Sequence, residues 1–515
     1  MRSEKMDDLL MDKLDKKNLE LFKFILFSED GVSFSQIQKK FSLSQPTCYR
    51  YINQLFIDVQ KCFDLDSNIN LDVKSDHIYK ITFDKNVGVN FYIDKLRVFY
   101  IQQNTTFIVL HSLIRNKYVS IEQLAYDVNL SVPTIYKKIA NINKLARKLD
   151  VKLSVNSKFG NITGSEIGVR FFYYLFFWNI YHTVDLTYLN DFKIKDFFLS
   201  TSLENRLCCS QKVKLKLIQK INSKRISNKN TVSLTKDFQK DIEPFLLHDL
   251  NNRTFQLSSN QNNNENLYFS FIIRFAIPEL DSFSHKEKIF HQFKNSKNRI
   301  GNLLNTFLAD YSRKFNFKFS YESYIDTYYL LLIRFIYIKH FNYDIYSLDY
   351  NYPKLQQYSL QNRHYLSMIE KIKVFLVSEC KILKINFLNF NKSSIDTLLA
   401  ILYFCYITNK KIEPVKLYVS YSKNLYTIPT IKNFLKKFYN TNTIKFTDTI
   451  AEADILISDT YEGSIENIQH FYFDSEFNNE TWFNLIEFIN HYINTHNSFY
   501  LPNNKYHDDN SSFMP

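Results

Sequence analysis

A chain of 515 residues with 45% hydrophobic side chains and a net charge of +13 is long enough for several globular domains. Its most apolar run, residues 171–181, is about half as long as a membrane span needs, and the charged first eight residues do not resemble a secretory signal. Its six cysteines lack metal-site spacing and suit reduced thiols, so we expect a cytoplasmic protein without a membrane association.

The positive charge is distributed unevenly. Residues 1–165 carry 24 basic and 18 acidic groups, residues 166–410 carry 33 and 21, and residues 411–515 carry 8 and 13. A basic body with an acidic C-terminal part predicts separate roles and favours a polyanionic partner for the body. A solvated lysine-rich surface is the alternative that charge alone leaves open.

A phrase of twenty residues occurs twice near the N-terminus. Residues 33–52 and 120–139 are identical at eight of twenty positions, and the two copies lie 87 residues apart. In each copy a short amphipathic segment is followed by a turn, then by a serine suited to cap a helix and a proline suited to its first turn. The repetition favours two helix-turn-helix motifs over an ordinary helical hairpin with a basic surface.

The second helix of such a motif enters the DNA major groove. Its spacing predicts inward-facing Cys48, Ile52 and Leu55 in the first copy, and Ile135, Ile139 and Ile142 in the second. The residues expected to meet DNA are Gln45, Thr47, Arg50, Tyr51 and Gln54, and Val132, Thr134, Lys137, Lys138 and Asn141. Arg50 and Gln54 suit base edges, whereas Lys137 and Lys138 suit phosphates.

Each copy is followed by two segments that alternate apolar and polar residues. They are residues 69–73 and 77–83 after the first copy, and 151–155 and 161–163 after the second, which predicts a hairpin wing behind each motif. Residues 130–165 hold seven basic groups, including Lys158 in the wing, and one acidic group. We therefore expect the second motif to contribute most of the DNA affinity.

The second wing leads into the phrase "GNITGSEIGVRFFYYLFFW", residues 160–178, with Gly164, Glu166 and Arg170 at characteristic spacing. Together with the paired motifs, this phrase resembles the Mga/AtxA-type virulence regulators of Gram-positive bacteria. The resemblance implies winged helix-turn-helix domains at 1–88 and 89–165. It further implies PTS-regulation-like helical domains at 166–280 and 281–411, and an EIIB-like α/β domain at 412–515.

The remaining sequence also indicates a mainly α multidomain protein. Helical patterns recur between residues 171 and 406, interrupted by an Asn-rich segment, 258–264, that we expect to be a loop and by a boundary near Pro278. Residues 412–515 alternate strands and helices, which predicts a small α/β sheet. The segment Val419 to Ser422 lacks the cysteine that accepts phosphate in transport EIIB domains, so we expect dimerisation or sensing there instead.

The resemblance also implies phosphorylation of histidines in the helical domains. The candidates are His285, His340, His182 and His248, with His291 and His364 as further possibilities. A phosphoryl group adds roughly two negative charges, enough to rearrange a helical interface.

No nucleotide-binding, hydrolase or metalloprotease motif occurs in the sequence, so we expect no enzyme activity, catalytic residue, cofactor or metal. The expected function is a transcriptional regulator, an activator of virulence or of surface and metabolic genes. Its expected partners are double-stranded DNA, a second copy of the chain or a larger assembly, and PTS phosphotransfer proteins. An RNA-binding antiterminator and a phosphocarrier are the alternatives.

Overall fold

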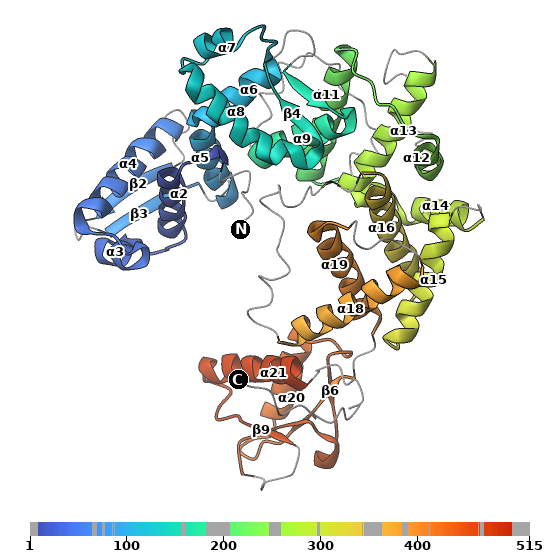
Figure 1. The fold of residues 1–515 in the computed structure, drawn as a ribbon. Helices are drawn as coiled ribbons and strands as arrows, with labels where there is room; N and C mark the ends of the chain where they lie inside the picture. The colour runs from blue at the N-terminus through green and yellow to red at the C-terminus, as the bar shows by residue number, and fades with distance from the viewer. Residues whose placement is uncertain are drawn as a thin grey trace, which may run out of the picture. The chain divides into compact units, whose positions relative to one another are not determined.

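The computed structural model describes residues 9–63, 69–74, 78–84, 86, 88–155, 161–181, 207–246, 259–295, 299–341, 343, 363–383, 390–410, 413–461, 463 and 468–496. These residues are mainly helical, with a small parallel sheet near the C-terminal end (Figure 1). The chain forms two compact units, residues 1–309, 324–354 and 377–401, and residues 310–323, 355–376 and 402–515. None of the described helices is long and apolar enough to cross a bilayer.

The first repeat lies in a module of helices and a three-stranded antiparallel sheet, here called the first winged module. Its elements are α2 (Lys13–Leu26), β1 (Val32–Ser33), α3 (Phe34–Phe41), α4 (Gln45–Phe63), β2 (Ile69–Lys74) and β3 (Ile78–Phe83). The strands are ordered β1-β3-β2, with Ile69 opposite Phe83 and Lys74 opposite Ile78. The predicted hairpin behind the first motif is therefore present.

The second winged module repeats this plan with one more helix in front. Its elements are α5 (Val89–Gln103), α6 (Thr105–Arg115), α7 (Ile121–Asp127), α8 (Val132–Ala146), β4 (Val151–Leu153) and β5 (Ile162–Gly164). The amide of Asn143 on α8 both donates to and accepts from the backbone of Leu153, at 2.8 and 2.7 Å. The predicted wing is present, and this pair of bonds fixes it to the second helix of the motif.

Helix α9 (Glu166–Tyr181) continues directly from the second wing and is buried on nearly every side. It contacts β4 and β5 of the wing and also α11, which lies beside it (Figure 1). A side chain at Gly168 would place its Cβ 2.1 Å from the carbonyl oxygen of Leu149, so this approach of helix to wing requires glycine. The wing and the helices after it are thus packed as one body.

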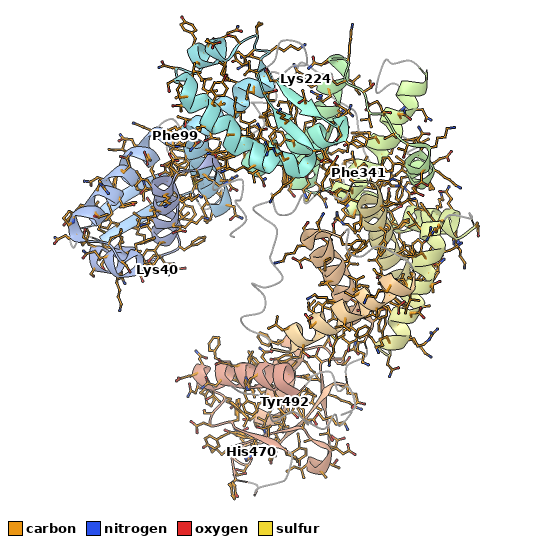
Figure 2. All side chains as sticks on the ribbon, viewed as in Figure 1. Lys40, Phe99, Lys224, Phe341, His470 and Tyr492 are labelled. Atoms are coloured by element: carbon orange, nitrogen blue, oxygen red, sulfur yellow. The ribbon has the colours of Figure 1, made fainter. Side chains whose placement is uncertain are left out.

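The helices that follow are α11 (Cys209–Ser227), α12 (Lys236–Ile242), α13 (Ser259–Ala276), α14 (Phe283–Asn295), α15 (Arg299–Lys314), α16 (Tyr321–His340), α18 (Arg363–Ile382) and α19 (Lys392–Asn409). The expected loop at 258–264 is wrong, because α13 begins at Ser259. The weak helix propensity of asparagine is overridden there by the packing of the rest of α13, in which Glu265 and Tyr268 are buried. Aromatic rings make much of this core, including a cluster around Phe341 (Figure 2).

A buried ionic network lies next to Pro278, where the sequence predicts a domain boundary. Asp281 accepts a 2.6 Å hydrogen bond from Arg274 of α13 and another of 2.6 Å from Tyr329 of α16. The side chains of Arg274 and Asp281 are almost fully buried. The helices on the two sides of residue 280 are therefore packed together in this region.

The C-terminal sheet has four parallel strands in the order β7-β6-β8-β9. Its elements are β6 (Val415–Val419), α20 (Thr427–Phe438), β7 (Ile444–Phe446), β8 (Ile455–Ser458), β9 (Gln469–Tyr472) and α21 (Asn479–His496). The chain leaves β6 toward β7 on one side and returns to β8 on the other, so the direction of winding changes between β6 and β8. The predicted small α/β sheet is confirmed.

Candidate nucleic-acid interface

The two helix-turn-helix motifs share the hydrogen bonds of their capping serines and the hydroxyl contacts that begin their second helices. Ser33 and Ser120 each accept a hydrogen bond from the backbone N–H three residues later, at 3.3 Å in both cases. After the turn, the hydroxyls of Ser44 and Thr47 lie 2.9 Å apart, and the hydroxyls of Ser131 and Thr134 lie 2.8 Å apart. The repeated phrase therefore encodes one local structure twice.

The turn between the helices also repeats in its backbone. Ser42 and Asn129 occupy the same position of the phrase and have φ angles of 50° and 51°, in the left-handed region. The next residue donates its N–H back to the first helix in both copies, from Leu43 to Gln38 and from Leu130 to Ala125, at 3.2 and 3.1 Å. This pattern ends the first helix sharply and sets the direction of the second.

The predicted inner faces of α4 and α8 are confirmed. Cys48, Ile52 and Leu55 are buried in the first module, and Ile135, Ile139 and Ile142 are buried in the second. Burial also raises the pKa of the Cys48 thiol. These helices are therefore held by apolar packing on one side, and their opposite sides face outward.

The side chains that project furthest from each second helix form a line that we call the outer stripe. On α4 the outer stripe comprises Pro46, Tyr49, Arg50, Asn53 and Ile57, and on α8 it comprises Pro133, Tyr136, Lys137, Ala140 and Lys144. These ten residues occupy equivalent positions of the repeat. Arg50 and Lys137 are thus predicted site residues at the centre of the exposed surface.

The other predicted site residues lie at the edges of these stripes. Gln45 is exposed. The others are half-buried: Thr47, Tyr51, Gln54, Val132, Thr134, Lys138 and Asn141. Gln54 donates a 2.8 Å hydrogen bond to buried Asp58, which constrains the amide proposed to read bases. Tyr51 lies between Lys17 and Arg50, at 5.8 and 6.0 Å from its ring centroid. Lys158 lies outside the described residues.

Sequence reasoning missed the two tyrosines of the outer stripes. Tyr49 is 38% exposed and packs on Phe34 at 4.4 Å between ring centroids, and Tyr136 is 58% exposed. Their identity in both copies of the phrase was the available signal, because a tyrosine retained beside diverging neighbours indicates a shared role. A phenol on this surface can donate to a phosphate or stack on a sugar or base.

The positive charge of the second module lies beside its outer stripe. Four basic side chains are exposed from the end of α8 to strand β4: Lys144, Arg147, Lys148 and Lys152. Asp150 is the single acidic residue among the described residues from 130 to 155. A phosphate backbone would meet a surface of one sign here, as expected for a module that contributes affinity.

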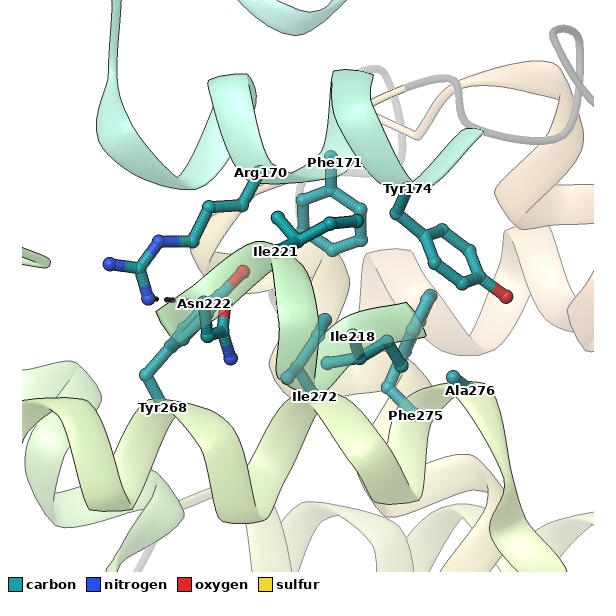
Figure 3. Close-up of a pocket in the computed structure, with 10 residues that line it drawn as sticks. All are labelled: Arg170, Phe171, Tyr174, Ile218, Ile221, Asn222, Tyr268, Ile272, Phe275 and Ala276. Atoms are coloured by element: carbon teal, nitrogen blue, oxygen red, sulfur yellow. Dashed lines mark hydrogen bonds between the residues drawn. The ribbon is translucent and has the colours of Figure 1, made fainter. Parts of the chain in front are cut away.

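Arg170 connects α9 to the helices behind the winged modules. Its guanidinium makes a bidentate pair with Glu265 of α13, at 2.7 and 2.9 Å, and donates to Glu166 at 2.8 Å. The remaining N–H groups reach the side chain of Asn222 (Figure 3) and the carbonyl oxygen of Asn230, both at 3.2 Å. Every N–H of this buried arginine therefore has an acceptor.

A cavity of about 20 Å³ lies next to this arginine, between α9, α11 and α13 (Figure 3). Its walls are mostly apolar, and the buried side-chain nitrogen of Asn222 is the polar group there without a hydrogen-bond partner. A space of this size and lining fits about one water molecule. The cavity does not fit a metabolite.

The histidine candidates have different surroundings. The Nδ1 atom of His285 lies 2.9 Å from Asp281, and its side chain is 33% exposed. Although burial alone would raise it, the His285 hydrogen bond and the Arg274 charge hold the pKa of Asp281 well below its ordinary value. His291 lies on the same helix, α14. His182 and His248, and the side chain of His364, lie outside the described residues.

His340 belongs to an ion-paired cluster. Its Nε2 atom lies 2.8 Å from Asp241, and Lys339 lies 2.8 Å from Asp237 and 2.7 Å from Asp241. Burial would lower the pKa of Lys339, but its hydrogen bonds to the two aspartates raise it. The ligand atoms of Asp237, Asp241 and His340 lie within 4.8 Å of one another, as in a metal site, but the Lys339 ammonium already pairs with both carboxylates.

The C-terminal sheet has a hydrogen-bonded carboxylate where its direction of winding changes, between β6 and β8. The carboxylate of Asp459, after β8, accepts hydrogen bonds from the backbone N–H and the hydroxyl of Ser422, at 2.7 and 2.9 Å. Although burial opposes it, these bonds lower the pKa of Asp459. Ligands of doubly wound sheets bind at this place, and here Asp459 and Ser422 bond to each other instead.

Comparison with known proteins agrees with this geometry in the second module. No curated protein matches the chain. Residues 89–177 match the Mga helix-turn-helix domain, a match that begins at α5 and ends within α9. This segment is therefore similar to the DNA-binding domain of transcriptional regulators of the Mga type.

Proposed function

We propose that this protein is a DNA-binding transcriptional regulator that acts as an activator and whose activity is controlled by histidine phosphorylation and self-association. The observation that carries the proposal is the pair of equivalent helix-turn-helix motifs, the second of which lies in the segment similar to the Mga helix-turn-helix domain. A basic surface beside α8 supplies attraction to phosphates, and Arg50 on α4 supplies a side chain suited to guanine.

A salt titration of duplex binding tests this function. Fluorescence anisotropy of a labelled duplex would compare the wild-type protein with a Lys137→Ala/Lys144→Ala variant, in which two exposed outer-stripe lysines are removed. Each lost phosphate contact lowers the slope of log affinity against log salt by about 0.9. The magnitude of this slope should therefore be smaller by nearly 2 in the double variant than in the wild type.

The matched control is Lys216→Ala/Lys236→Ala, which removes two exposed lysines from α11 and α12 and the same total charge. We expect this variant to bind like the wild type. An equal loss in both variants would mean that overall charge, and not the outer stripe, attracts DNA. Preference for an RNA hairpin over duplex DNA would replace this function with the antiterminator alternative.

We propose His285 as the regulatory phosphorylation site. Asp281 holds Nδ1 of the ring, which orients the imidazole and leaves Nε2 for the phosphoryl group. In His340 the Nε2 atom is instead directed at Asp241, and the side chain is 11% exposed. A phosphoenolpyruvate-driven phosphotransfer mixture should label the wild-type protein and the His291→Ala variant. Label retained by His285→Ala would contradict the assignment.

We propose that two copies associate through the carboxyl edge of the C-terminal sheet. Four large apolar side chains in the loops that follow β6, β8 and β9 are at least 80% exposed: Leu425, Tyr426, Tyr461 and Phe477. A surface of this kind usually marks a protein contact. Light scattering should show a dimer for the wild type and a monomer for Leu425→Ser/Phe477→Ser. A dimer in both would place the contact elsewhere.

A further inference from the structure

Helix α5 is packed on two sides, and this packing determines how the two winged modules can approach DNA. Seven of its fifteen residues are buried, including Tyr92, Leu96, Arg97 and Tyr100. A helix that merely connected two independent domains would be exposed along most of its surface. The burial indicates that α5 holds both modules.

On one side, α5 contacts α4 of the first module through a buried hydrogen bond. The hydroxyl of Tyr100 donates to the carboxylate of Asp58 at 2.9 Å, and both residues are less than a tenth exposed. The other oxygen of Asp58 accepts from Gln54, one turn earlier on α4. The helix that carries the first outer stripe is thereby attached to α5.

The same side of α5 also packs on the first wing. The ring of Tyr92 lies 5.9 Å from Phe63 at the end of α4 and 5.6 Å from Phe83 at the end of β3. Lys95 lies over the ring of Phe63 at 5.2 Å. Together with Asp58 and Tyr100, these residues form what we call the joint between the modules.

Helix α5, itself the first helix of the second module, is also attached to α9 and to α6. Arg97 donates to the carbonyl oxygens of Asn179 and Ile180 at the end of α9, at 2.7 and 2.8 Å. Asn104, directly after α5, accepts from Thr106 and so caps α6. Phe107 of α6 then stacks against Phe176 of α9 at 5.9 Å. Contacts of α5 therefore reach both the first module and the rest of the second.

We propose that the two winged modules bind DNA as one rigid body, so that the operator contains two contact segments at a single fixed separation and rotational phase. This inference rests on the DNA-binding function proposed above and specifies the form of DNA that fits it. Modules on a flexible linker tolerate altered spacing, because the linker only changes the effective concentration of the second module. A packed joint cannot extend, so altered spacing removes one module from its segment.

Operators with inserted base pairs test the proposal. An operator selected from genomic fragments with the full-length protein would be footprinted to find the two segments that one protomer protects, and 5 or 10 base pairs would be inserted between them. Ten base pairs add about 34 Å but keep both segments on the same face of the duplex. We expect both insertions to weaken binding by roughly 100-fold or more, to the level reached when one segment is randomised.

Three outcomes would overturn the rigid pair. Recovery of affinity with 10 but not 5 inserted base pairs would show that the joint extends. Equal binding to all spacings, or a single protected segment, would show that one module makes all the contacts. An absence of duplex binding would instead refute the proposed function itself.

Two surface variants assign the segments to the modules without disturbing the joint. Arg50→Ala and Lys137→Ala change exposed residues of α4 and α8, respectively. Each should reduce protection most strongly at a different segment of the same operator. Loss at the same segment in both variants would also overturn the proposal.

Discussion

Replacing Arg170 by methionine should strongly destabilise the region that joins the winged modules to the helices behind them. Glu265 is fully buried and Arg170 is 2% exposed, so the substitution leaves a carboxylate in the interior without its counter-charge. The backbone N–H of Val232, at 2.7 Å, would remain as a donor to Glu265. Removing one partner of such a pair costs about 3–5 kcal/mol in free energy of unfolding.

The chain offers a local probe for this measurement. It contains two tryptophans, Trp178 on α9 and Trp482 on α21, so a Trp482→Phe background restricts the fluorescence signal to the helix that carries Arg170. With an ordinary urea dependence, the loss should lower the midpoint of this transition by at least roughly 1 M.

A second substitution separates the buried charge from lost packing. Adding Glu265→Gln to Arg170→Met removes the unpaired charge and keeps a side chain that accepts from Val232, so the double variant should be more stable than Arg170→Met alone. A cost below about 1 kcal/mol for the single variant, or no recovery in the double variant, would refute the reasoning.

Three further predictions concern other sites. Burial and neighbouring carboxylates raise the pKa of Asp15 to about 6, so its contribution to stability falls as the pH rises from 3.8 to 6, and Asp15→Asn should raise the melting temperature at pH 7.5 but not at pH 4. Gly168→Ala should cost roughly 1–3 kcal/mol or more, because the new methyl group meets the Leu149 carbonyl, and faster proteolysis after α8 would report it. Asp459→Ala should allow inorganic phosphate to bind the freed Ser422 groups, seen as a phosphate-dependent rise in the melting temperature that the wild type lacks.

Local patterns predicted much of the structure of the first 165 residues. The repeated phrase predicts both helix pairs, because a capping serine, a first-turn proline and apolar residues at helical spacing act within a few residues of one another. The inner faces of α4 and α8 and both hairpins were predicted for the same reason. The exposure of Tyr136 was not, since an aromatic side chain at helical spacing suits either face.

Contacts between segments far apart in the chain could not be predicted from local sequence patterns. Arg170 pairs with Glu265, 95 residues later, and no local pattern identifies that partner. The loop expected at 258–264 is wrong for a related reason, because packing around Glu265 stabilises a helix that asparagine propensity disfavours. No sequence pattern singles out Asp459, and only the return of the chain to β8 brings it to Ser422.

Helix α9 has a consequence for how such a protein can evolve. Its first turn closes the second wing through Gly168, its arginine is enclosed by α11 and α13, and its last carbonyls are held by Arg97 of α5. A recombination event that exchanged the helices after residue 165 for those of a relative would separate two of these contacts at once, the one with the second wing and the one with α5. The sequences of the winged modules and of the helices behind them should therefore diverge as partners.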